Sequence, residues 1–175
     1  ADQMDKFAIK ANASAKALGA ATKQYTDASL IYFQQGLGME EATQRTDVTI
    51  KMSNVLGESA SKVSDYMTAI WNNFDDGSQS LEYFGDVLAK LGASTASSAE
   101  EIAEGLDKFA AVSNTVGLSY EYATTALATV VAETRQSADV VGTAFKTLFA
   151  RIQDLELGKT LDDDTTLGTY SQALD

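Results

Sequence analysis

Apolar residues recur every three or four positions along almost the whole chain, which is the spacing of one face of an α-helix. No stretch alternates apolar and polar residues for long enough to predict a β-strand. The 175 residues include no proline, a residue that breaks helix interiors. The sequence therefore predicts an all-α fold, a helical bundle of about seven helices.

Six of the expected helices occupy residues 39–56, 60–74, 80–91, 99–116, 120–133 and 138–157. Before them, the helical spacing runs from Met4 to Tyr25 without a break. We therefore expect one long N-terminal helix within residues 1–38, which could continue from an upstream segment. After Gly158 the periodicity stops, so we expect residues 158–175 to form an irregular tail. The chain starts with Ala-Asp-Gln-Met, without an initiator Met, and reads as a piece of something longer.

Residue types that cap helices stand at the expected boundaries. Ser98 and Glu101 have the spacing of a capping box, in which each side chain accepts an amide of the other residue. Two glycines stand where a left-handed C-cap is needed, and a serine N-cap follows each of them. These pairs are Gly57 with Ser59 and Gly117 with Ser119. Loops are expected at residues 75–78 and 92–95.

Several of these positions repeat along the chain. At an offset of 60 residues, matches concentrate at caps and turns, and a further stretch matches at an offset of 57. We interpret residues 39–92 and 98–157 as two tandem three-helix repeats, with chance similarity as the alternative. The matched positions are Glu40-Glu41 with Glu100-Glu101, Asp47 with Asp107, Ser53-Asn54 with Ser113-Asn114, Gly57 with Gly117, Ser59 with Ser119, Ser80 with Ser137, Gly85 with Gly142, and Leu91 with Leu148.

The chain is acidic, with 13 Lys and Arg against 25 Asp and Glu and a formal charge of −12. Residues 1–37 hold four Lys against three Asp, a net charge of +1, so the other residues carry −13. Nucleic-acid binding and docking on anionic membranes both need basic surfaces, so neither is expected. Residues 109–132 carry one charge, but their Ser, Asn, Thr and Gly content is too polar to predict a membrane span.

The chain has no His and no Cys, which excludes a Ser-His-Asp triad, a thiol protease, a disulfide framework and a zinc finger. Adjacent acids are the remaining candidates for chemistry: Glu40-Glu41, Asp75-Asp76, Glu100-Glu101 and Asp162–Asp164. Neighbours on a helix point about 100° apart, so such pairs do not flank a substrate as a glycosidase requires. Acids in first turns are better explained by the helix dipole. We expect no enzyme, no cofactor and no metal site.

Two apolar patterns leave alternatives open. Large aromatic residues cluster around the 75–79 loop, where a packed core is expected more often than a ligand pocket; they are Tyr66, Trp71, Phe74, Tyr83 and Phe84. A stripe on the last helix steps by four, three, four and three residues and consists of Val141, Phe145, Leu148, Ile152 and Leu155. This stripe is either the internal seam of the second repeat, which we favour, or a self-association surface.

Three blocks of sequence resemble the core helical region of tail tape measure proteins of long-tailed bacteriophages and prophages. They are Ser64–Phe74, Leu118–Thr129 and Thr134–Arg151, the last followed by Ile152–Glu156. The similarity covers about residues 39–175. The resemblance implies a structural protein of the virion that lies in the tail lumen, is made in the host cytoplasm, and sets tail length.

As partners, the resemblance implies tail-tube subunits and tail assembly chaperones, and it implies exit from the tube before DNA passes. Two other classes of protein share some of these features. A secreted or surface-displayed helical interaction module, such as an adhesin or toxin stalk, would also be helical and acidic. A carboxylate-based hydrolase would need two buried acids with raised pKa in one cleft.

Overall fold

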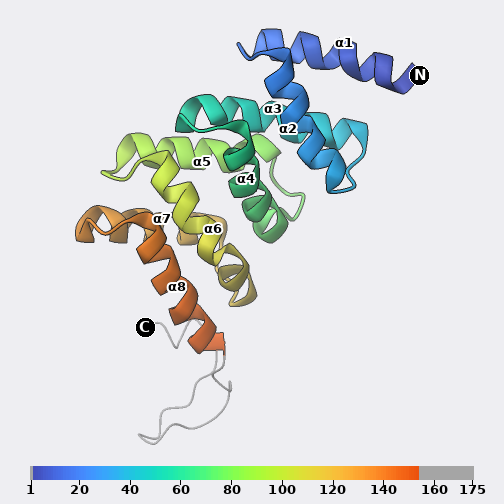
Figure 1. Ribbon diagram of the computed structural model, residues 1–175. Helices are drawn as coiled ribbons and strands as arrows, with labels where there is room; N and C mark the ends of the chain where they lie inside the picture. The colour runs from blue at the N-terminus through green and yellow to red at the C-terminus, as the bar shows by residue number, and fades with distance from the viewer. Residues whose placement is uncertain (1, 154–175) are drawn as a thin grey trace, which may run out of the picture.

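Residues 2–153, which the computed structural model describes, form eight α-helices and no strand (Figure 1). The all-α prediction is confirmed, with eight helices in place of seven. Residues 154–175, which include the predicted tail, lie outside the described residues. The helices are α1 (Asp2–Ala17), α2 (Thr22–Gln34), α3 (Met39–Leu56), α4 (Ala60–Phe74), α5 (Leu81–Ser94), α6 (Ala99–Thr115), α7 (Tyr120–Thr134) and α8 (Ala138–Gln153).

The helices stack along one direction, from α1 at one end of the molecule to α8 at the other (Figure 1). Most helices pack only against helices close to them in sequence, whereas α6 contacts α3, α4, α5, α7 and α8. The main hydrophobic core follows this stack from Tyr32 to Ile152, and a second, smaller core joins α1, α2 and the flanks of α3 and α4. The arrangement is an elongated stack with α6 as its most enclosed helix.

The single N-terminal helix predicted for residues 1–38 is wrong, because α1 and α2 are separate helices. Gly19 adopts a left-handed backbone with φ of 69°, and the amide of Ala20 bonds to the carbonyl of Ala15 at 2.8 Å. This glycine ends α1 in the way typical of helix C-termini. The apolar spacing hid the break because Leu18 and Tyr25 stay in step across the turn.

The predicted caps are confirmed. Ser98 and Glu101 form a capping box, with the Ser98 amide 2.7 Å from Glu101 Oε2 and the Glu101 amide 3.1 Å from Ser98 Oγ. Ser59 and Ser119 cap α4 and α7. Gly57 and Gly117 both have positive φ, 71° and 81°. Each serine cap contributes roughly 1 kcal/mol to the stability of its helix.

The loop predicted at residues 92–95 begins too early, since α5 continues to Ser94. Gly92 lies within α5, and the start of α6 passes directly over it. A Cβ added at Gly92 would lie 2.4 Å from the backbone nitrogen of Ala99. The glycine therefore serves close packing between two helices and does not end α5.

A second glycine pair brings α6 and α8 together. A Cβ added at Gly142 would lie 2.3 Å from the carbonyl oxygen of Gly105, so the two backbones touch at this point. Around this contact, Phe109 of α6 packs edge-to-face against Phe145 of α8, with ring centroids 5.2 Å apart. This close approach of α6 and α8 thus depends on two residues without side chains.

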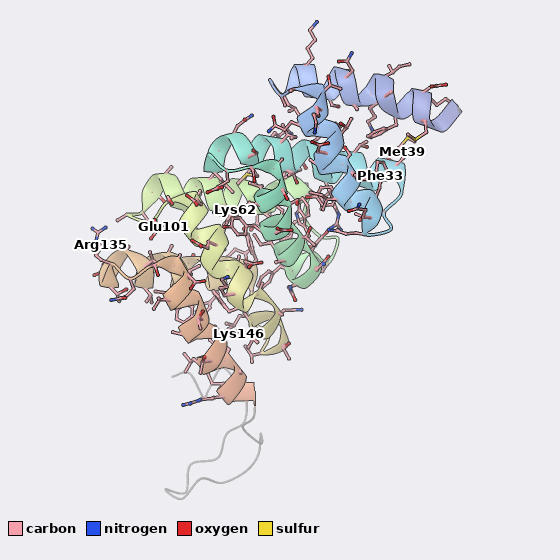
Figure 2. The ribbon with its side chains drawn as sticks, in the orientation of Figure 1. Phe33, Met39, Lys62, Glu101, Arg135 and Lys146 are labelled. Atoms are coloured by element: carbon pink, nitrogen blue, oxygen red, sulfur yellow. The ribbon has the colours of Figure 1, made fainter. Side chains whose placement is uncertain are left out.

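A surface ion-pair bridge joins α4 to α6. Lys62 Nζ lies 2.9 Å from Glu58 Oε1 and 3.3 Å from Glu100 Oε1 (Figure 2). Its pKa is raised, chiefly by the hydrogen bond to Glu58. Because these side chains lie at the surface, solvent screening keeps the contribution of the bridge to stability small.

Candidate functional site

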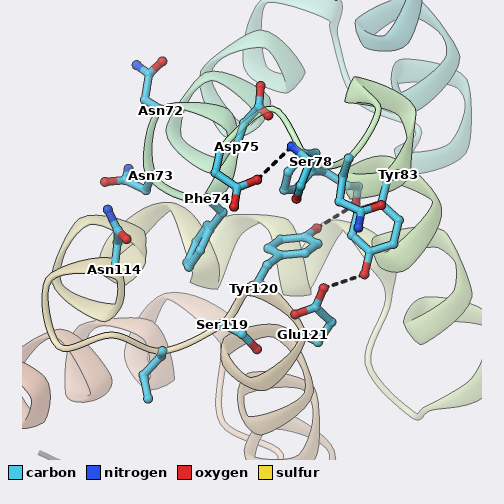
Figure 3. Close-up of a pocket in the computed structure, with 14 residues that line it drawn as sticks. Asn72, Asn73, Phe74, Asp75, Ser78, Tyr83, Asn114, Ser119, Tyr120 and Glu121 are labelled. Carbon is cyan, nitrogen blue, oxygen red and sulfur yellow. Dashed lines mark hydrogen bonds between the residues drawn. The ribbon is translucent and has the colours of Figure 1, made fainter.

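A pocket of about 480 Å³ opens where the α4–α5 connection faces the α6–α7 connection (Figure 3). Its walls combine carboxylates, side-chain amides and aromatic rings. They include no Lys or Arg. The lining residues are Asn72, Asn73, Phe74, Asp75, Asp76, Ser78, Gln79, Tyr83, Phe84, Asn114, Leu118, Ser119, Tyr120 and Glu121.

One rim of the pocket is the turn that the sequence Asp-Asp-Gly-Ser builds. Asp75 Oδ1 accepts the amide of Gly77 and Asp76 Oδ1 accepts the amide of Ser78, both at 2.9 Å. Gly77 takes a positive φ of 81°, which glycine adopts readily. Hydrogen bonds from Ser78 hold the pKa of Asp76 below its ordinary value, so this rim stays charged at neutral pH.

The opposite wall comes from α5 and α7. The Tyr83 hydroxyl donates to Glu121 Oε1 at 2.5 Å, and this bond lowers the pKa of Glu121 and raises that of Tyr83. The Tyr120 hydroxyl donates to the carbonyl of Phe84 at 2.6 Å, and burial raises the pKa of Tyr120 well above its usual value. The rings of Phe84 and Tyr120 pack edge-to-face, with their centroids 5.0 Å apart. The hydroxyls of Tyr83 and Tyr120 on this wall are therefore already hydrogen-bonded within the protein.

The pocket offers hydrogen-bond acceptors and ring surfaces. The pKa values of Asp76 and Glu121 are both lowered, whereas a glycosidase general acid needs a raised pKa. Within the described residues, no group of three or more acidic side chains could hold a metal ion. The arrangement suits binding of polar groups better than acid–base chemistry.

The aromatic cluster predicted around the 75–79 loop divides between core and pocket. Trp71 and Phe84 are buried, and Tyr66 is nearly so, as a packed core requires. Phe74 and Tyr83 are half-buried and line the pocket. The packed-core expectation therefore holds for the buried members, while Phe74, Tyr83 and one face of Phe84 line the hollow.

Sequence reasoning missed the half of the pocket that the 114–121 segment supplies. Asn114, Tyr120 and Glu121 lie at least 34 residues along the chain from the 75–80 connection. The sequence carries no signal for this pairing, because it depends on how α6 packs against α4 and α5. The Asn72-Asn73 pair beside Asp75-Asp76 is the one local hint of a polar site.

The other adjacent acids occupy first turns, as predicted. Glu40 and Glu41 begin α3, where Glu41 pairs with Arg45 at 3.0 Å. Glu100 and Glu101 begin α6. Asp162–Asp164 lie outside the described residues.

The stripe predicted on the last helix is only partly enclosed. Val141 and Ile152 are buried and Phe145 is half-buried against Phe109, whereas Leu148 is 46% exposed. Leu155 lies outside the described residues. In the described part, then, the stripe faces the α6–α8 contact with one leucine directed to the surface.

A second hollow of about 690 Å³ lies at the α1 end of the stack, among α1, α2 and the start of α3. We call it the end groove. Its walls are mostly apolar, and Phe33 and Met39 mark its position in Figure 2. The lining residues are Met4, Phe7, Thr26, Asp27, Leu30, Phe33, Leu37 and Met39.

None of the helices within residues 2–153 has both the length and the apolar character needed to cross a bilayer. The fold defines an all-α protein of stacked helices, and two of its hollows are those described above.

The chain belongs to the phage-related minor tail protein family, whose model matches residues 10–171. The resemblance to a phage tail protein is thereby confirmed at the level of the family. No curated protein and no solved structure matches the chain.

Proposed function

We propose that the chain is a segment of a tail tape measure protein, acting in tail-length determination, tail assembly and passage of DNA. The observation that carries the proposal is the family match over residues 10–171, since it makes the chain a phage tail protein. Among phage tail proteins, the three sequence blocks that resemble tape measure proteins favour this particular role. On this proposal the protein lies in the tail lumen of the virion and contacts tube subunits and assembly chaperones.

Helical geometry supports a role in measuring length. An α-helix advances about 1.5 Å for each residue, so an extended helix converts chain length directly into distance. The folded stack cannot measure in this way, because its helices reverse direction at connections of three residues (57–59) to six (75–80). No proline stands at any of these connections, so each can become helical. We propose that the stack is the stored form and that the helices straighten during assembly.

Two tandem repeats would make the stored form modular. α4 and α7 are both 15 residues long, start 60 positions apart and begin after a serine N-cap. The preceding helices, α3 and α6, start 60 positions apart and are both followed by a left-handed glycine. These coincidences support duplication of a three-helix unit, which could open one unit at a time.

The charge suits a protein that occupies a DNA conduit. A chain with a formal charge of −12 is repelled by DNA and would not obstruct its exit. The proposed role is structural and not enzymatic. It uses helix packing and charge and requires no cofactor or metal.

Protease protection of purified virions tests this proposal. Peptides from residues 2–153 should resist digestion in intact particles and appear once the tail tube has been opened or the DNA ejected. A protein on the outside of the tail, or one missing from the virion, would contradict the assignment. A known surface protein of the same virion serves as the control for protease access.

A further inference from the structure

The end groove is an apolar surface that the described residues leave uncovered. Met4 is 70% and Leu30 is 54% exposed, although both line the groove. Its floor is ordered, since Phe7 and Phe33 pack edge-to-face with centroids 5.3 Å apart. A preformed apolar groove between two helices is the kind of surface that accepts leucine side chains from another segment.

The electrostatics of this end differ from those of the rest of the chain. Residues 2–37 hold four Lys and three Asp, a net charge of +1, whereas residues 38–153 hold 8 basic and 16 acidic side chains, a net charge of −8. The one carboxylate lining the groove, Asp27, is paired with Lys23 at 2.5 Å. Lys10 Nζ lies 2.8 Å from Thr43 Oγ1, one turn of α3 beyond Met39. An acidic ligand therefore meets least repulsion at this groove.

The chain itself contains a segment of matching chemistry. Residues 154–175 hold six acidic side chains against one Lys, a net charge of −5, together with apolar residues at intervals. The apolar residues are Leu155, Leu157, Leu161, Leu167, Tyr170 and Leu174. This segment follows α8, at the opposite end of the stack from α1 (Figure 1). A second copy can offer it to the groove without the segment running back along its own negatively charged stack.

We propose that residues 154–175 of one copy dock in the end groove of a second copy, which joins copies head to tail. Leucines of the acidic segment occupy the apolar groove, and its carboxylates face the end of the molecule that is not negatively charged. The interface is heterologous, since the groove of one copy binds the segment of another. A bound pair therefore still has one free groove and one free segment for further copies. This association concerns the chain alone and does not rest on its role in tail-length determination.

Sedimentation velocity of the full chain over a wide concentration range tests the proposal. We expect the weight-average sedimentation coefficient to rise with concentration. Leu30→Asp should weaken association at least about tenfold, because it places a charge in the groove. Val55→Asp is the matched control, since Val55 is equally exposed, at 54%, on α3 and does not line the groove. Circular dichroism melts of both variants verify that they fold.

A mixing experiment identifies the geometry. A Leu157→Ser, Leu161→Ser double variant keeps its groove but loses its segment, and Leu30→Asp does the reverse. At a concentration where the wild type associates, each variant alone should sediment close to the monomer, and an equal mixture should form a dimer that does not grow further. A wild-type chain that stays monomeric at all concentrations would overturn the proposal. So would self-association of the double variant, which would indicate groove-to-groove pairing.

Discussion

Two half-buried aspartates, Asp47 and Asp107, stand 60 positions apart on α3 and α6 and lie in different environments. Asp47 Oδ1 accepts a hydrogen bond from the Tyr25 hydroxyl at 2.6 Å. Burial raises the pKa of Asp107, with Lys108 opposing and Asp65 adding to the shift. Asp47 thus has a hydroxyl as hydrogen-bond partner, whereas burial disfavours the charged form of Asp107.

The pH dependence of stability should reveal this difference. The folded-state pKa of Asp107 is raised. The contribution of Asp107 to the free energy of unfolding is therefore most favourable at low pH, and it is lost as the pH rises through that pKa. Asp107→Asn should therefore raise the free energy of unfolding at neutral pH. This gain should vanish as the pH falls toward the ordinary carboxyl range, about 4.

Asp47→Asn should instead lower stability by about 1 kcal/mol, since a charge-assisted bond is weakened. Urea unfolding at several pH values measures both, and equal effects would contradict the account.

The glycine contact between α6 and α8 gives a second prediction for single residues. Gly142→Ala should destabilise the protein by about 1–3 kcal/mol, because the new Cβ would meet the backbone of Gly105. Gly85→Ala is the control, since its Cβ would meet the flexible end of Met52, with Sδ at 2.7 Å. That substitution should be near neutral, with helix propensity offsetting the crowding. Thermal unfolding compares them, and two equal melting temperatures would refute the close-contact interpretation.

Helices near the N-terminal end of the stack and the central helix α6 are held by different kinds of contact. The α2–α3 interface buries hydroxyls, such as Ser29 and Thr46, whose oxygens lie 3.1 Å apart. Tyr32 and Thr49 pair in the same interface at 2.5 Å. The interior face of α6 is instead apolar, with Ile102, Leu106 and Phe109 fully buried. Because apolar burial contributes more than a neutral hydrogen bond, α6 should be the last element to open.

Hydrogen exchange tests this order. Amides in the middle of α6 should exchange at least about tenfold more slowly than those in the middle of α2, which corresponds to about 1.4 kcal/mol of extra protection. Low-cost opening at the N-terminal end would help the stack to straighten. Uniform protection across the two helices would show that the molecule opens as one unit.

The sequence predicted the helices better than it predicted their arrangement. Period, caps and turn residues are local, so α3, α4 and the capping box at Ser98 could be located from the sequence alone. The break at Gly19 was missed because apolar spacing continued across it. The pocket was half missed because Tyr120 and Glu121 reach it only through tertiary packing. Local chemistry is readable from sequence, whereas contacts between distant segments are not.

At the scale of the molecule, shape and charge agree with the proposed place in the tail. The stack is elongated, with α1 and α8 at opposite ends (Figure 1). Its negative charge lies almost wholly after residue 37. The proposed repulsion of DNA therefore belongs to residues 38–175.

The charge predicts that the chain does not bind DNA. In a gel-shift or anisotropy assay at physiological salt, the full chain should leave double-stranded DNA unbound, because no basic stripe replaces phosphate counterions. Binding that weakens as salt is raised would refute the proposed repulsion. A basic DNA-binding protein of similar size provides the positive control.

Tail length is the most direct measure of the central claim. In a phage or prophage that encodes this chain, an in-frame duplication of residues 98–157 adds 60 residues. If these residues are read as extended helix, tails should lengthen by roughly 90 Å, at about 1.5 Å per residue. Deletion of the same range should shorten tails by a similar amount. Electron micrographs of assembled particles give the result, and intact tails of unchanged length in both variants would contradict a role as part of the ruler.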